Sequence, residues 1–270
     1  NACLSDHSLS FTPQSIVSFG GIPLDSKAQI KTYRRINSIK QGYNNHLKTT
    51  AGARMVLKVK GILIDLDGTL VDSREAYIEA LKRTWETLGL KNFNPAIALE
   101  IPRRLEQNQP ISDLIREGVT EKFLDVYLKT YYSITESKTK LFPNIPKTLE
   151  LLSKKVKLAL LTMRHVPKEN VGRELEKFGI AKYFQCIVTA LDTPFPKPSP
   201  KAITTCAEKL GVDINECAVV GDSICDIKAG KNAGAKTVAV LSGLFSRHEL
   251  TKEKPDLILE SLNQLPDFLL

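Results

Sequence analysis

The stretch Ile62-Leu63-Ile64-Asp65-Leu66-Asp67-Gly68-Thr69-Leu70-Val71-Asp72 joins an apolar, strand-like run to two carboxylates one residue apart and then to a Gly-Thr turn. On an extended segment, Asp65 and Asp67 have side chains on the same side of the chain. Like charges this close are unfavourable unless something positive lies between or beside them. A metal ion is the usual partner, so the stretch predicts a strand that ends at a cation or phosphate site.

The composition is that of a soluble protein. The chain has 270 residues, enough to bury a full core as one large domain or as a domain with an insert. Its residues are 42% hydrophobic and 25% charged, which is ordinary for soluble proteins. No stretch approaches the roughly 18 consecutive apolar residues that a membrane span requires, so we expect no membrane association.

The formal charge of +8 is concentrated near the start of the chain. Residues 1–54 contain seven Lys and Arg but only two Asp and Glu, so the remainder is only mildly basic. No basic stripe interleaved with aromatic residues appears, and we expect no nucleic-acid partner. A mildly positive surface suits an anionic small molecule. No obligate protein partner is evident.

Residues 1–54 also differ from the rest in composition. They are rich in Ser and Thr, poor in acidic residues and without helical periodicity, which is typical of a disordered extension. The same composition fits an organellar targeting segment. Alternatively, Met55 is the natural start of the protein. In each case we expect this segment to lie outside the fold.

The five cysteines form no CxxC pair and no disulfide framework. Cys186, Cys206 and Cys217 lie among apolar residues, where cysteine usually packs as a small hydrophobic side chain. This pattern favours a reducing setting. We expect a cytoplasmic protein, or an organellar one if residues 1–54 are a targeting segment.

From Met55 onward, short β-branched runs alternate with amphipathic helical patterns. Such alternation implies a parallel sheet covered by helices on both faces, with ligands bound beyond the carboxyl ends of the strands. We predict a Rossmann-like α/β/α core made of residues 55–72 and 140–270. The predicted strands are Val59–Ile64, Val156–Thr162, Cys186–Thr189, Ala218–Val220 and Thr237–Leu241, and the predicted helices are Pro146–Lys155, Lys168–Phe178, Pro200–Leu210 and Asp226–Ala233.

Residues 73–139 interrupt this alternation and show only helical spacing. We predict a helical cap inserted after the first strand, hinged near Asp72–Ser73 and near Phe142-Pro143. Its apolar and aromatic stripes are interpreted as a small core of its own. The two stripes are Tyr77, Ile78, Leu81, Trp85 and Leu88, and Phe123, Leu124, Tyr127, Leu128, Tyr131 and Tyr132.

Chemically distinctive residues follow the predicted strands at their carboxyl ends. Asp65 and Asp67 end the first strand, Thr162 ends the second, Lys197 follows the third and Asp222 follows the fourth. Ends of parallel strands meet at one edge of the sheet, so we expect these side chains to converge. Three carboxylates suit Mg²⁺, which prefers oxygen ligands. The lysine and threonine offer donors to phosphoryl oxygens, and Gly68 and Thr69 turn backbone N–H groups toward the same anion.

Four clusters in this order resemble the haloacid dehalogenase superfamily, in its phosphatase branch with a helical cap. They are Asp65-Leu66-Asp67-Gly68-Thr69, Leu161-Thr162, Lys197-Pro198 and Gly221-Asp222-Ser223-Ile224-Cys225-Asp226. Further segments resemble the phosphoglycolate phosphatase-like group: Leu70-Val71-Asp72-Ser73, Leu141-Phe142-Pro143-Asn144 and Val240-Leu241-Ser242-Gly243-Leu244. The resemblance implies a phosphatase that acts on a small phosphorylated metabolite, such as phosphoglycolate.

The resemblance also implies roles for these residues. Asp65 would attack phosphorus to form an aspartyl-phosphate, and Asp67 would protonate the leaving alkoxide and then activate water. Mg²⁺ would be held by Asp65, the backbone carbonyl of Asp67, and Asp222. Thr162 and Lys197, with the Gly68-Thr69 turn, would bind the phosphoryl oxygens. Asp226 would orient Lys197 or a metal-bound water.

Three cationic residues are weaker candidates. Arg164 stands two residues after Thr162, where it departs from the Asn-Lys or Ser-Ser of related phosphatases, and is a possible contact for a substrate carboxylate or phosphate. Arg103 and Arg104 in the predicted cap are possible substrate-selecting residues or simply a solvated helix end. His165 is interpreted as a loop residue and Cys225 as packing.

Alternative functions remain open. Asp67 argues against dehalogenation, because cleavage of a carbon–halogen bond needs no acid for an alkoxide. A phosphomutase of the β-phosphoglucomutase type would use the same four clusters. A non-catalytic binding protein on the same fold is the third possibility, although every catalytic position is intact.

Overall fold

The computed structural model describes residues 56–115 and 118–270, and within them a parallel six-stranded sheet forms the centre of the fold. The strands lie in the order β5-β4-β1-β6-β7-β8, so the first strand in the chain lies in the middle of the sheet. Their bounds are β1 Gly61–Ile64, β4 Lys157–Leu161, β5 Cys186–Val188, β6 Cys217–Gly221, β7 Lys236–Val240 and β8 Leu257–Leu259.

The apolar runs of the central strands are explained by burial on both faces. In β1, Ile62, Leu63 and Ile64 are all buried, although successive side chains point to opposite faces. Leu63 belongs to a cluster with Ile203 and Cys206 of α7 (Pro200–Leu210), and Ile62 and Ile64 face the other side. A strand covered on both faces reads as a continuous apolar run rather than an alternating one.

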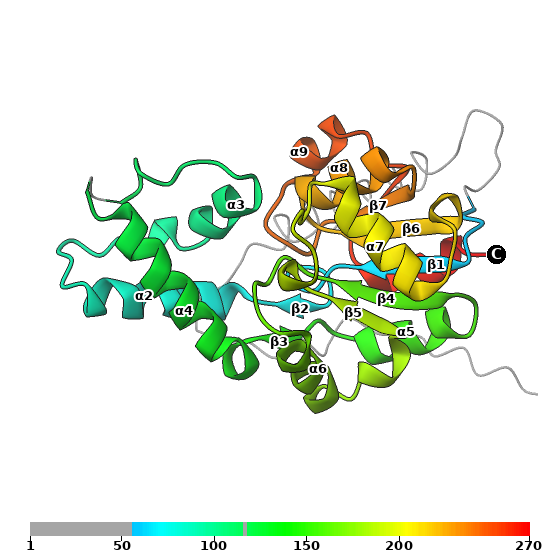
Figure 1. The fold of residues 1–270 in the computed structure, drawn as a ribbon, viewed down its shortest axis with the longest axis horizontal. Helices are drawn as coiled ribbons and strands as arrows, with labels where there is room; N and C mark the ends of the chain where they lie inside the picture. Colours follow the sequence, from blue (N-terminus) through cyan, green and yellow to red (C-terminus); the bar gives the residue numbers. More distant parts are fainter. Residues whose placement is uncertain (1–55, 116–117) are drawn as a thin grey trace, which may run out of the picture. The chain divides into compact units, whose positions relative to one another are not determined.

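Helices flank this sheet on both sides (Figure 1). Helices α7 and α8 (Ile224–Ala233) pack together on one face, whereas α5 (Ile145–Ser153) packs on the other face with the C-terminal 3₁₀ segment Leu262–Phe268. Helices α6 (Lys168–Lys177) and α9 (Arg247–Lys252) complete the layers. Short 3₁₀ turns span Ala181–Tyr183, Ala190–Asp192 and Ile214–Glu216.

Two short strands connect the sheet to a group of helices. Strand β2 (Val71–Asp72) pairs antiparallel with β3 (Lys140–Leu141), so the chain leaves and returns at one place. Between them lie α2 (Arg74–Thr87), the 3₁₀ turn Pro95–Ile97, α3 (Glu100–Glu106) and α4 (Thr120–Lys138). Figure 1 shows α2, α3 and α4 gathered beyond one end of the six-stranded sheet, on the side where the separate β2–β3 pair lies.

These helices enclose an aromatic core. Trp85 packs edge-to-face on Phe123, and Phe123 stacks on Tyr127 at a ring separation of 5.8 Å. All three are buried. Ile78, which the sequence places on the same stripe, is 45% exposed and does not belong to this core.

The predicted fold class is confirmed: a parallel sheet with helices on both faces carries a helical insertion. All five predicted strands are present, with ends that differ by one or two residues. Strand β8 and the β2–β3 pair were not predicted. The division into a core and a cap at residues 73–139 stays a prediction, and residues 1–54 lie outside the described part of the chain. No helix among the described residues is long and apolar enough to cross a membrane.

Candidate active site

Asp65 and Lys197 form a buried ion pair at the carboxyl edge of the sheet. Asp65 directly follows β1, and its backbone N–H donates to Val220 O in the neighbouring strand at 2.9 Å. Lys197 Nζ donates to Asp65 Oδ1 at 2.7 Å, to Asp226 Oδ1 at 2.5 Å and to the Leu161 carbonyl at 3.2 Å. An ammonium group has three N–H donors, so these bonds fix its position.

Asp226 is held in place by the start of α8. Its Oδ2 accepts from the Ser223 N–H at 3.1 Å and from the Ser223 hydroxyl at 2.6 Å, while the Asp226 N–H donates back to Ser223 at 3.2 Å. This reciprocal arrangement is a capping box that begins the helix. One oxygen therefore caps the helix and the other binds Lys197.

Asp222 lies against two glycines. A Cβ added to Gly243 would lie 1.6 Å from Asp222 Oδ2, and a Cβ on Gly68 would lie 2.5 Å from it. Gly68 also has a φ of +82°, a backbone conformation that favours glycine. Asp222 accepts from two neutral donors, the Thr69 hydroxyl at 3.3 Å and the Leu244 N–H at 3.2 Å. The glycines thus let two loops close directly on this carboxylate.

The donor set of this cluster fits a divalent cation. Oxygens of Asp65, Asp222 and Asp226 lie within 4.8 Å of one another, and Lys197 is the cation that pairs with two of them. Burial raises the pKa of Asp65 to about 7, although Lys197 acts in the opposite direction. Burial and the neighbouring carboxylates of Asp65 and Asp226 raise the pKa of Asp222 well above its ordinary value. Several carboxylate oxygens with excess negative charge are what Mg²⁺ binds.

Asp67 lies in a different environment, beside Arg164. Arg164 Nε donates to Asp67 Oδ2 at 2.8 Å and Nη2 donates to Oδ1 at 2.7 Å, a two-bond geometry that arginine favours with carboxylates. The Ser73 hydroxyl and Tyr131 Oη also donate to Asp67, the latter at 3.1 Å. Burial would raise the pKa of Asp67, but Arg164 and these hydrogen bonds lower it below its usual range.

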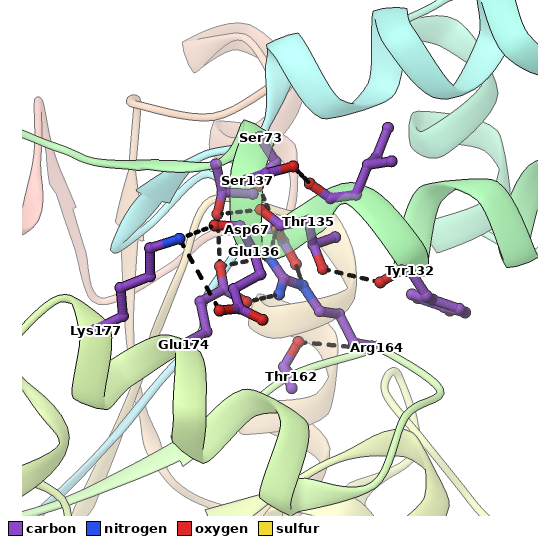
Figure 2. Close-up of polar contacts among 12 residues, drawn as sticks. Asp67, Ser73, Tyr132, Thr135, Glu136, Ser137, Thr162, Arg164, Glu174 and Lys177 are labelled. Carbon is purple, nitrogen blue, oxygen red and sulfur yellow. Dashed lines mark hydrogen bonds and ion pairs between the residues drawn. The ribbon is translucent and has the colours of Figure 1, made fainter.

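Arg164 lies between the carboxylates of Asp67 and Glu174 and pairs with both. Figure 2 shows its guanidinium between Asp67 and Glu174 of α6. Glu174 also accepts from the Thr139 hydroxyl at 2.6 Å. The guanidinium and both carboxylates are nearly enclosed, so this network links β1, β4 and α6 in a buried interior.

Comparison with known proteins settles the family. The family model described as haloacid dehalogenase-like hydrolase matches residues 62–240, which include the buried carboxylates, Lys197 and Arg164. This chain belongs to that family.

Relatives of this hydrolase include enzymes named phosphoglycolate phosphatase and enzymes named pyrophosphatase. A phosphoglycolate phosphatase from Aquifex aeolicus is 33% identical over 210 residues, covering 76% of this chain and 93% of the relative. The pyrophosphatase PpaX from Bacillus velezensis is 29% identical over 213 residues, covering 77% and 95%. A haloacid dehalogenase-like hydrolase from Streptococcus pneumoniae has the same fold, with a TM-score of 0.68 at 21% identity, covering 78% and 98%.

Most of the predicted site residues of this hydrolase meet at one edge of the sheet. Asp65, Lys197 and Asp226 are in contact, and Asp222 joins them through the carboxylate cluster. Thr162 follows β4 at the same edge, where its hydroxyl accepts from the Arg164 N–H at 3.2 Å. The side chain of Asp67 turns to Arg164, away from the three clustered carboxylates.

The arginines of the helical segment have other partners. Arg103 pairs with Glu249 of α9 and lies over the Phe245 ring at 5.0 Å. Arg104 pairs with Glu100 at 2.9 Å and with Asp113. These contacts join α3 to α9 and brace α3 internally, which is a structural use of both side chains.

Sequence reasoning missed two acidic residues of the hydrolase site. Glu174 lies with Val171 and Leu175 on the buried face of α6, a spacing that could have revealed it. Glu106 at the end of α3 has a buried Oε2 with no hydrogen-bond partner in the described part of the chain. Burial, followed by the charges of Asp222, Asp65 and Asp226, raises its pKa well above the ordinary value. No local pattern marks Glu106, because its position depends on how α3 meets the sheet.

Proposed function

We propose that this hydrolase is a Mg²⁺-dependent phosphatase that transfers the phosphoryl group of a small phosphorylated metabolite to Asp65 and then to water. The observation that carries the proposal is the Asp65 carboxylate, bound to Lys197 at 2.7 Å beside the oxygens of Asp222 and Asp226. The names of the phosphatase and pyrophosphatase relatives support the same type of reaction.

Asp65 is suited to be the nucleophile. In the first step, one of its oxygens bonds to phosphorus as the bond from phosphorus to the ester oxygen breaks. The leaving alkoxide takes a proton from Asp67 and departs as an alcohol. Lys197 and Thr162 would bind the phosphoryl oxygens, with one phosphoryl oxygen replacing an existing acceptor of the Lys197 ammonium.

Asp67 would serve again in the second step. Its carboxylate accepts a proton from water as the water oxygen attacks phosphorus, and the Asp65 oxygen is released with inorganic phosphate. Arg164 favours the ionised form of Asp67, which suits this proton-accepting role. The proton needed in the first step can arrive with the substrate, because a phosphate monoester has a second pKa of about 6.

Mg²⁺ would be held by Asp65, Asp222 and the backbone carbonyl of Asp67, with Asp226 close by. When bound, it would offset the negative charge that otherwise repels an anionic substrate from this cluster. We also propose that residues 73–139 act as a cap. The Tyr131–Asp67 hydrogen bond and the Arg103–Glu249 pair are contacts that such a cap would make with the core.

The test uses purified protein with phosphate esters, in the presence of Mg²⁺ or EDTA. We expect release of inorganic phosphate that requires Mg²⁺, and a phosphoenzyme trapped on Asp65 after rapid quenching. Asp65→Asn should abolish both. Ester cleavage that survives Asp65→Asn would contradict the proposal. Isomerisation of a hexose 1-phosphate without free phosphate would identify a phosphomutase instead.

A further inference from the structure

A cavity beside Asp67 is lined by four tyrosine rings and several aliphatic side chains. This cavity has a volume of about 220 Å³, and its walls include Tyr77, Tyr127, Tyr131, Tyr132, Leu105 and Met163. Tyr131 stacks on Tyr77 with ring centres 5.0 Å apart and lies 6.5 Å from Tyr127 at an angle of 9°. Mostly apolar walls with a few polar groups are typical of pockets for small organic molecules.

The position of the cavity relates it to the leaving group. Asp67 forms part of its wall, and Tyr131 Oη contacts Asp67 at 3.1 Å. In the proposed reaction, Asp67 protonates the oxygen that departs from phosphorus. The alcohol attached to that oxygen therefore has to extend from Asp67 into the space between the tyrosine rings.

The charged groups around the cavity disfavour an anionic alcohol. Among the described residues that line it, the charged side chains are Asp67, Glu106 and Arg164. The guanidinium of Arg164 is already bound to Asp67 and Glu174. A second carboxylate or phosphate on the substrate would therefore meet no unpaired cation among these lining residues, and an unpaired buried charge is costly.

Two lining residues, Glu106 and Tyr127, each have a buried polar atom without a hydrogen-bond partner among the described residues. For Tyr127, which is 1% exposed, this atom is the hydroxyl oxygen. Buried hydroxyl groups normally have a partner, so the Tyr127 hydroxyl is an unusual feature of this wall. The cavity also has enough space, because about 150 Å³ of apolar cavity holds one benzene molecule.

We infer that the substrate is a phosphomonoester whose alcohol is uncharged and carries an aromatic or similarly apolar ring. Glycolate and phosphate, which are anionic leaving groups, are therefore expected to be disfavoured. This inference rests on the proposed function and narrows the class of substrate. The phosphoryl-transfer residues are those of the proposed phosphatase, whereas the leaving group differs from those of the relatives named for phosphoglycolate and pyrophosphate.

The experiment compares benzyl phosphate, 4-carboxybenzyl phosphate and phosphoglycolate with wild-type protein and Mg²⁺. The two benzyl esters share the same reacting bonds and differ only in a distant carboxylate. We expect kcat/KM for benzyl phosphate to exceed that for each anionic ester by about 100-fold, because a carboxylate buried in the cavity would lack a counter-ion. Equal or faster cleavage of phosphoglycolate would overturn the inference while leaving the proposed phosphatase intact.

A substitution tests the source of this selectivity. Met163→Lys should lower the ratio between benzyl phosphate and 4-carboxybenzyl phosphate by about tenfold, since it adds an unpaired cation to the cavity wall. Ile78→Lys, at an exposed position of α2, is the matched control and should leave the ratio unchanged. An unchanged ratio in a folded Met163→Lys protein would contradict the assigned role of the cavity.

Binding gives a readout that needs no turnover. Asp65→Asn protein should bind benzylphosphonate more tightly than phosphonoacetate, which carries a carboxylate, by isothermal titration. The reverse order would overturn the inference even if Met163→Lys failed to fold. If the wild-type protein cleaved none of the three esters, the proposed function itself would fail, a result distinct from a wrong preference among esters.

Discussion

At the scale of single residues, Arg164 shows how one side chain stabilises two buried carboxylates. Its guanidinium contacts Asp67 at 2.7 Å and also pairs with Glu174, and all three side chains are nearly enclosed. Replacing one member of a buried ionic network leaves the other charges unpaired. The resulting loss in the free energy of unfolding is larger than the stability that the intact network adds over apolar residues of the same size. The stability of this region therefore depends on all three members together.

We predict that Arg164→Met lowers the free energy of unfolding by about 3–5 kcal/mol, because two buried carboxylates lose their cation. Adding Glu174→Gln should recover part of this loss. Urea unfolding at neutral pH measures both. Arg74→Met is the control, since the Arg74–Asp72 pair is exposed and contributes about 0–1 kcal/mol. A loss as small as that of the control would show that the buried network does not stabilise the fold.

Gly243 allows a second residue-scale prediction. A Cβ at this position would overlap Asp222 Oδ2, so Gly243→Ala has to displace that carboxylate. We expect Mg²⁺ affinity to fall by at least about tenfold, as for changes that misplace a metal ligand. Isothermal titration with MgCl₂ measures this. Gly172→Ala is the matched control, because its added Cβ would meet only Ile187 at 3.8 Å. Equal affinities in both variants would exclude Asp222 as a ligand.

The sequence predicted the site residues that directly follow strands and missed those placed by packing. Asp65, Thr162 and Asp222 were recognisable because an apolar run sets their position at a strand end. Glu174, the partner of Arg164, was not recognisable from the sequence. Their pairing depends on the distance between α6 and the loop after β4. Arg164 was only a possible substrate contact, and the structure shows it bound to Asp67 and Glu174.

At the scale of elements, strand β8 shows why some of the sheet escaped prediction. It has only three residues, Leu257–Leu259, too few for a clear periodic pattern. Its position is fixed partly by Asp256, which accepts from the Thr237 N–H and hydroxyl, both at 2.9 Å. Contacts of this kind join strands that the sequence does not show to be neighbours.

Asp256 provides a prediction about pH. Partial burial would raise its pKa, but hydrogen bonds from Thr237 and Lys236 lower it below the ordinary value. A carboxyl with a lowered folded-state pKa stabilises the protein above the unfolded-state pKa of about 3.9, and this is lost as pH falls through the folded value. Asp256→Asn should therefore cost about 1 kcal/mol at pH 7, allowing for its partial exposure, and less below pH 4.

Urea unfolding of wild-type and Asp256→Asn proteins at several pH values measures this difference. Glu79→Gln, which alters an exposed pair within α2, is the comparison. A difference between wild type and Asp256→Asn that grew as pH fell would have the wrong sign and would contradict the assigned contact.

At the scale of the whole molecule, the acidic cluster gathers residues from distant parts of the chain. Asp65 and Asp226 are 161 positions apart, yet both bind Lys197. The parallel order of the strands predicted this convergence from the sequence. The exact grouping was not predictable, because Asp226 rather than Asp67 completes the set of close carboxylates.

This convergence makes folding and cation binding interdependent. We predict that Mg²⁺ at about 100 times its dissociation constant stabilises the protein by about 2.7 kcal/mol and raises Tm by roughly 5–10 °C. Differential scanning fluorimetry with MgCl₂ and with EDTA measures the shift. Asp222→Asn should reduce it strongly, whereas Asp125→Asn, on the exposed face of α4, should not. A wild-type Tm indifferent to Mg²⁺ would contradict cation binding at this site.

The antiparallel pairing of β2 with β3 has a topological consequence. Val71 lies opposite Leu141 and Asp72 opposite Lys140, so the outgoing and returning chains are neighbours at about 5 Å. A two-residue hairpin turn could join them directly, bypassing the 67 residues from 73 to 139. We therefore expect that residues 73–139 could be shortened or exchanged without changing the order of strands in the sheet.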